Sequence, residues 1–134
     1  MAGERRFEAD AEAIGAIRGY VRDALVRHGC PDSRIDAAVL CASEVATSAL
    51  LNGDGTPIDV VLDLTERARI TVRDTPMLDD GVGLLIVDTF ADAWGYAPRE
   101  GGAAVWFEID LRERPIPEPG GDWRRRRSDV VEPS

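Results

Sequence analysis

Residues 58–74, IDVVLDLTERARITVRD, hold two runs in which apolar and polar side chains alternate. The first run covers residues 58–64 and the second covers residues 69–74, with the short segment Glu66-Arg67-Ala68 between them. A period of two predicts β-strands that turn one face toward a core. Because the connection is short, the two strands are predicted to pair as an antiparallel hairpin.

Helical patterns occupy most of the chain before this hairpin. Residues 11–28 are predicted to form a helix, because apolar side chains recur there at near-helical spacing, and Gly29 is predicted to end it. A second helix is predicted to start after Pro31, with Asp32 or Ser33 as its N-cap. The stretch Asn-Gly-Asp-Gly just before the hairpin is predicted to break this second helix.

After the hairpin, a loop is predicted at residues 75–83 and a third helix at residues 84–93. Three further strands are predicted at residues 5–7, 94–98 and 103–111. The resulting order, βααββαββ, predicts an α/β two-layer sandwich with a mixed, mostly antiparallel sheet covered on one face by about three helices. Proline, glycine and charged residues dominate residues 113–134, which we interpret as a flexible tail after a domain of residues 1–112. Its four consecutive arginines are either simply solvated or a tether for a partner or an anionic surface.

Composition and charge exclude several functional classes. The 134 residues carry a net charge of −9, and residues 1–114 hold 21 acidic side chains against 12 arginines, so direct nucleic-acid binding is not expected. One histidine and two cysteines do not make a metal site from protein side chains alone. No apolar run is long enough to span a membrane and residues 1–6 lack a signal-peptide core, so we expect a cytoplasmic protein.

The second predicted helix carries a line of polar side chains. Glu44, Ser48 and Asn52 are spaced i, i+4 and i+8, which places them on one face of a helix. On this spacing alone, the line is either a strip that faces a ligand or an ordinary solvated helix face. The chain contains no lysine, so any mechanism that requires a catalytic lysine is excluded.

Four short boxes resemble those of one known family, the anti-sigma-factor serine kinases. The first box, SEVATSA (43–49), is similar to their SELVTNA box, and the second, VRD (72–74), is similar to the strand that ends in an adenine-reading aspartate. The third, GVGLLIV (81–87), is similar to their GRGLLLV box. The fourth, AWG (93–95) with GGAAVWFE (101–108), is similar to their RWG…GGKTVWFEL ending. The similarity covers roughly residues 5–111. It implies the Bergerat-type ATP fold of the gyrase, Hsp90, histidine kinase and MutL (GHKL) superfamily.

The resemblance also implies roles for individual residues. Glu44 matches the general base that acts toward an attacking hydroxyl, and Asp74 matches the aspartate that accepts a hydrogen bond from the adenine amino group. Gly81 and Gly83 match glycines that let backbone N–H groups at a helix N-terminus approach phosphate oxygens, although both could merely serve a turn. Ser48 and Asn52 fall in the same nucleotide-binding helix. The implied cofactors are ATP and Mg²⁺.

The chain departs from the family pattern at several of these positions. Ser48 replaces the asparagine that holds Mg²⁺ in the family, and Ala103 and Ala104 replace the lysine and threonine of GGKT. Six residues separate Asp74 from Gly81, which implies a shorter segment than the family has. Loss of the metal ligand, of the family's full-length lid segment and of the cation together argues against efficient phosphoryl transfer.

Two functions are therefore expected from the resemblance. The first is a regulatory protein that binds a sigma factor or an anti-sigma antagonist and has a degenerate ATP site. The alternative is an active ATP-dependent serine/threonine protein kinase, an anti-sigma factor that phosphorylates an antagonist protein. Family members dimerise through the sheet and the first strand, and the residues here are compatible with either a homodimer or a monomer.

Overall fold

The computed structural model describes residues 2–52, 55–75, 82–99 and 102–112, and within them the predicted order of elements is confirmed. The elements are β1 (Ala2–Phe7), α1 (Ala13–Arg27), α2 (Asp32–Asn52), β2 (Ile58–Leu64), β3 (Arg67–Thr75), α3 (Val82–Phe90), β4 (Ala93–Arg99) and β5 (Gly102–Asp110). The predicted tail, residues 113–134, lies outside the described residues.

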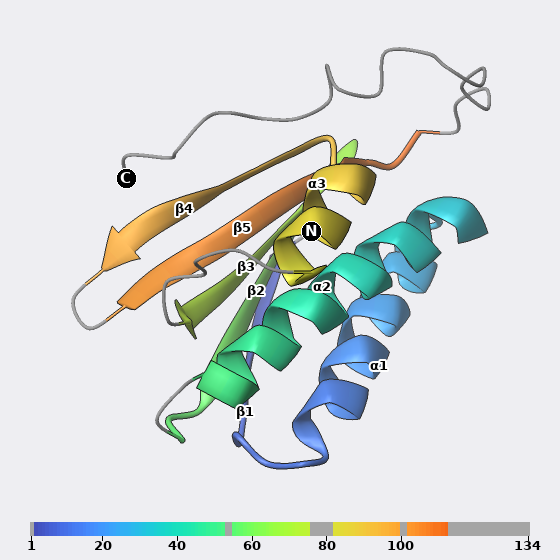
Figure 1. The fold of residues 1–134 in the computed structure, drawn as a ribbon. Helices are drawn as coiled ribbons and strands as arrows, with labels where there is room; N and C mark the ends of the chain where they lie inside the picture. The colour runs from blue at the N-terminus through green and yellow to red at the C-terminus, as the bar shows by residue number, and fades with distance from the viewer. Residues whose placement is uncertain (1, 53–54, 76–81, 100–101, 113–134) are drawn as a thin grey trace.

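The described strands form one sheet in the order β1-β2-β3-β5-β4, and every neighbouring pair in it is antiparallel. Figure 1 shows the three helices on one face of this sheet, with α2 between α1 and α3. The predicted α/β two-layer sandwich is therefore confirmed, but the sheet, predicted to be mixed and mostly antiparallel, is antiparallel throughout its described strands. The last strand, β5, lies between β3 and β4 instead of at an edge.

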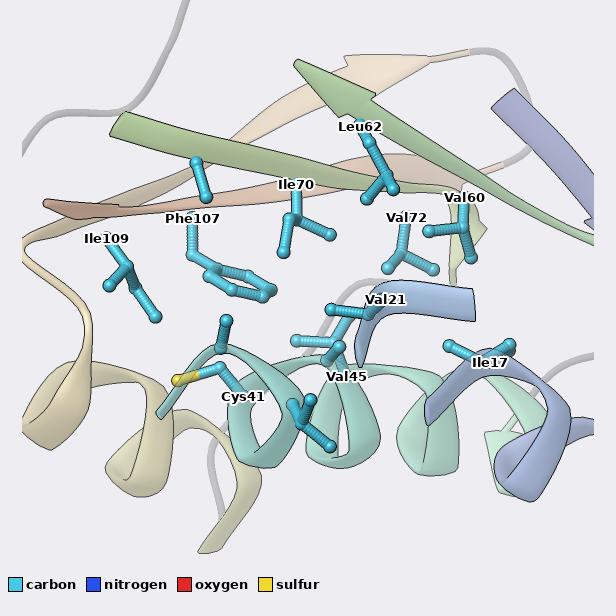
Figure 2. Close-up of a cluster of buried hydrophobic side chains, with 14 of the residues drawn as sticks. Ile17, Val21, Cys41, Val45, Val60, Leu62, Ile70, Val72, Phe107 and Ile109 are labelled. Atoms are coloured by element: carbon cyan, nitrogen blue, oxygen red, sulfur yellow. The ribbon is translucent and has the colours of Figure 1, made fainter. Parts of the chain in front are cut away.

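The core lies between the helices and the inner face of the sheet. Alternate residues of β2, β3 and β5 point into it, as the period of two predicts, and meet Ile17 and Val21 of α1 and Val45 of α2 (Figure 2). Phe107 is the largest fully buried side chain among the described residues. Burial of each such side chain stabilises the fold by roughly 1.5–3 kcal/mol.

The ends of the two long helices show where local rules succeed and where they fail. Gly29 has a positive φ of 82° just after α1, which is the conformation that ends a helix, as predicted. His28 precedes it, and its Nε2 lies 2.8 Å from the carbonyl oxygen of Thr65 in the β2–β3 turn. The predicted N-cap of α2 is wrong, because Asp32 already belongs to the helix and the carbonyl of Pro31 accepts hydrogen bonds from the first turn.

Two further boundaries also differ from the predictions. Helix α3 begins at Val82 and ends at Phe90, whereas the sequence predicted residues 84–93; Ala93 instead starts β4. In the hairpin, β3 begins at Arg67, so the turn is shorter than the predicted segment 66–68. The β2–β3 ladder continues as far as the pair Leu64–Ala68, and the β4–β5 ladder already includes Ala93, which accounts for the shorter turn and for the earlier end of α3.

The outer face of the sheet carries ion pairs between neighbouring strands. Arg6 of β1 makes two hydrogen bonds to the buried carboxylate of Asp59 on β2, at 2.8 and 3.1 Å. Arg69 of β3 donates to Glu108 of β5 at 2.9 Å and stacks on the Trp106 ring, 4.2 Å from its centroid. Trp106 is only 4% exposed, and among the described residues its Nε1 has no hydrogen-bond partner.

Candidate functional site

The polar line on α2 belongs to a helix that packs against both α1 and α3. Glu44 and Ser48 are both half-buried, and Asn52 is the last residue of the helix. All three belong to one uninterrupted helix, so the predicted common face holds in the backbone. Because α2 packs on both β3 and α3, the helix that carries this line contacts the elements that carry other predicted site residues.

Cys41, one turn before Glu44, connects this line to the core, and the sequence analysis did not single it out. Its side chain is fully buried, and this burial raises the pKa of the thiol to about 12, with the Glu44 carboxylate adding to the increase. The charge of Glu44 therefore acts across one helical turn on a core residue. Glu44 stands at the boundary between the apolar interior and the candidate site.

The polar side chains that flank the line are partly used by the helix itself. The hydroxyl of Thr47 donates to the backbone carbonyl of Ser43 at 2.7 Å, a bond within one turn of α2. Ser43 is itself buried. Thr47 therefore has a structural use for its hydroxyl.

The C-terminal end of β3 carries the predicted adenine-reading residue. Asp74 is the penultimate residue of β3, next to a shift in the register of the β3–β5 pairing between Val72 and Thr75. In that register Thr75 pairs with Ala103 of β5, the position of the family's lysine. Figure 1 shows the C-terminal ends of α2 and β3 at the same end of the sheet, so Asp74 and Ala103 belong to the end that α2 reaches with Asn52.

Helix α3 begins with one of the two predicted glycines. Gly83 is the second residue of α3, and Gly81 lies outside the described residues. The opposite end of α3 is fixed by a contact that the sequence analysis missed: Trp94 of β4 donates from its Nε1 to the Asp88 carboxylate at 2.9 Å. The signal was present, because a tryptophan that packs on a core usually finds a partner for its N–H within reach.

The donor chemistry of the described residues fits the implied Mg²⁺-ATP only in part. Glu44 supplies a carboxylate at a half-buried position, but Ser48 supplies a hydroxyl where an amide oxygen would be the better ligand for Mg²⁺. Among the described residues, no group of three or more histidine, cysteine, aspartate and glutamate side chains could hold a metal ion. Within the same residues, no helix is both long and apolar enough to cross a membrane.

Comparison with known proteins supports the fold. A crystal structure of the RsbU and RsbW domains of Rv1364c from Mycobacterium tuberculosis matches with a TM-score of 0.71 and 21% sequence identity. The match covers 85% of this chain but 33% of that chain. No protein-family model and no curated protein matches the sequence. At this identity the likeness establishes a shared fold and leaves the activity to be argued from the residues.

Proposed function

We propose that this protein is a regulator that binds a sigma factor or an anti-sigma antagonist and that its ATP site is degenerate. Two observations together support the proposal. The chain shares its fold with a structure that contains an RsbW domain. On the polar line of α2, Ser48 matches the position of the Mg²⁺-binding asparagine in the family that the sequence resembles. A domain of this kind retains the surface of the fold for docking. Its capacity for phosphoryl transfer is reduced, because the metal and phosphate contacts are weakened.

The first experiment is a calorimetric titration of the full chain with Mg²⁺-ATP and with ADP. We expect binding too weak to saturate at millimolar nucleotide, because Ser48 and Ala103 each remove one contact to the metal or the phosphates. A micromolar dissociation constant in the presence of Mg²⁺ would contradict the degenerate site. In parallel, purified sigma factors and antagonist proteins from the same genome should include one that binds the chain without nucleotide.

The alternative, an active serine/threonine protein kinase, is favoured by Glu44 and Asp74. Glu44 is half-buried on the helix that packs against β3, which is a suitable setting for a general base, and Asp74 is the penultimate residue of that strand. When bound, Mg²⁺-ATP would supply the phosphoryl group. Transfer of labelled phosphate to an antagonist protein, lost in Glu44→Gln, would establish this alternative in place of the first proposal.

Restoring the site tests both proposals together. Ser48→Asn returns the amide oxygen, and Ala103→Lys returns a positive charge at the end of β5 beside β3. The double variant should bind Mg²⁺-ATP more tightly than the parent, and adding Asp74→Asn should cancel the gain by weakening adenine recognition. If the double variant gains no affinity, the polar line on α2 is not part of a nucleotide site.

A further inference from the structure

The end of α3 is fastened to the sheet by a small set of hydrogen bonds. Trp94 Nε1 donates to Asp88 Oδ1 at 2.9 Å, which joins the last turn of the helix to the start of β4. Asp92, in the connection, donates from its backbone N–H to the Glu108 carbonyl at 2.8 Å and accepts from the Asp110 N–H at 2.6 Å. The turn after α3 is therefore fixed to β5, and the helix itself is fixed through Asp88.

The Trp94 ring is held in place independently of this bond. The ring packs against the core, and its backbone pairs with Phe107 in the β4–β5 ladder. In contrast, Val87 is the one fully buried side chain among residues 86–90 of α3, and Phe90 is exposed. A fixed indole N–H thus meets the last turn of a helix that also packs against α2, so the bond links the position of that turn to the sheet.

The geometry of a short helix makes its first residues sensitive to this attachment. Nine residues span roughly 12 Å, and a tilt of about 10° around the last turn displaces the first residue by roughly 2 Å. Hydrogen bonds from N–H groups to oxygen are formed over a range of only about 0.5 Å. A small change in the direction of the α3 axis would therefore move Gly83, in the first turn, out of hydrogen-bonding range of a ligand at that end of the helix.

We propose that Asp88 and Trp94 are positioning residues, whose hydrogen bond sets the direction of α3 and with it the place of Gly83 in the nucleotide site. The consequence for nucleotide rests on the proposed site around Glu44 and Ser48. The anchoring of α3 does not rest on it, because the anchor is a contact between the helix and the sheet.

Hydrogen exchange of the full chain, followed by mass spectrometry, tests the anchor directly. Trp94→Phe keeps an aromatic ring but removes the donor, and Asp88→Ala removes the acceptor. Both should accelerate exchange of the α3 amides by roughly tenfold or more, while those of α1 keep their rates. Asp88→Asn retains an oxygen acceptor and should lie between the parent and Asp88→Ala.

Trp106→Phe is the matched control, because it removes an indole N–H that has no partner among the described residues. It should leave the exchange of α3 relative to α1 unchanged. The double variant Asp88→Ala with Trp94→Phe should exchange no faster in α3 than the faster single variant, since each change removes the same bond. Equal acceleration in α1 and α3, or none in α3, would overturn the proposal.

A nucleotide titration of the same variants separates this proposal from the proposed function. If the parent binds Mg²⁺-ATP, Trp94→Phe should raise its dissociation constant at least several-fold and Asp88→Asn should raise it less. An unchanged affinity in Trp94→Phe would contradict the link to Gly83. If the parent binds no nucleotide, the degenerate ATP site of the proposed function stands and the link to Gly83 is refuted, while the exchange rates still decide whether Asp88 and Trp94 anchor α3.

Discussion

Raising the pH from 8 to 10 should destabilise this protein through the Cys41 thiol. Burial raises the pKa of this thiol from its ordinary value of 9.0 to about 12, and the Glu44 carboxylate contributes further. Because the folded-state pKa is the higher one, folding favours the protonated thiol. The resulting stabilisation is complete below pH 9 and is lost as the pH rises from 9 toward about 12.

The expected loss follows from the two pKa values. At pH 10 the thiol of the unfolded chain is largely ionised and that of the folded chain is not, which favours unfolding by on the order of 1 kcal/mol relative to pH 8. Urea unfolding at the two pH values measures this change in the free energy of unfolding. Cys41→Ala provides the comparison, because its small cavity costs the same at both pH values whereas the ionisable group is gone.

The difference between the two proteins isolates Cys41. The pKa values of Tyr20 and Cys30 are also raised by burial, but these residues are present in both proteins, so their contribution cancels. The parent should therefore lose on the order of 1 kcal/mol more than Cys41→Ala between pH 8 and pH 10. Equal losses in both proteins would refute the reasoning and place Cys41 in contact with water.

Two further predictions concern stability. Asp59→Ala should lower the free energy of unfolding by about 1–2 kcal/mol, because it removes two charge-assisted hydrogen bonds from the exposed side chain of Arg6. The control Asp63→Ala, at an exposed position of the same strand, should change it by less than about 0.5 kcal/mol. Ile70→Ala should lower the free energy of unfolding by about 2–5 kcal/mol, because Ile70 is fully buried in the central strand. Its control, Val61→Ala, replaces a partly exposed side chain and should lower it by less than about 1 kcal/mol. Thermal and urea unfolding at neutral pH measure both pairs, and a control variant that loses as much as its partner would contradict the burial assigned here.

The order and type of the elements could be predicted because they depend on local patterns. Alternation in residues 58–74 requires a strand pair wherever one face is buried, and Gly29 supplies the conformation that ends a helix. The start of α2 was predicted wrongly for a physical reason. Asp32 is a good N-cap by type, but the first carbonyl that the helix uses comes from Pro31, so Asp32 enters the first turn instead.

The candidate site was predictable to the extent that it lies within single elements. The spacing of Glu44, Ser48 and Asn52 is a property of α2 alone, so the sequence contains it. The burial of Cys41 beside Glu44 and the bond between Trp94 and Asp88 depend on which elements pack together. Such contacts join segments whose distance in space is set by the order of the strands, and no local pattern encodes that order.

The place of β5 in the sheet has a consequence for synthesis of the chain. A ribosome makes this strand last among the described elements, yet β3 and β4 have no common neighbour until it enters between them. A nascent chain that ends before Gly102 therefore holds two strands with open edges, which are templates for pairing with other chains. Folding is expected to finish only when residues 102–110 have emerged, and fragments that stop earlier should self-associate instead of persisting as partial domains.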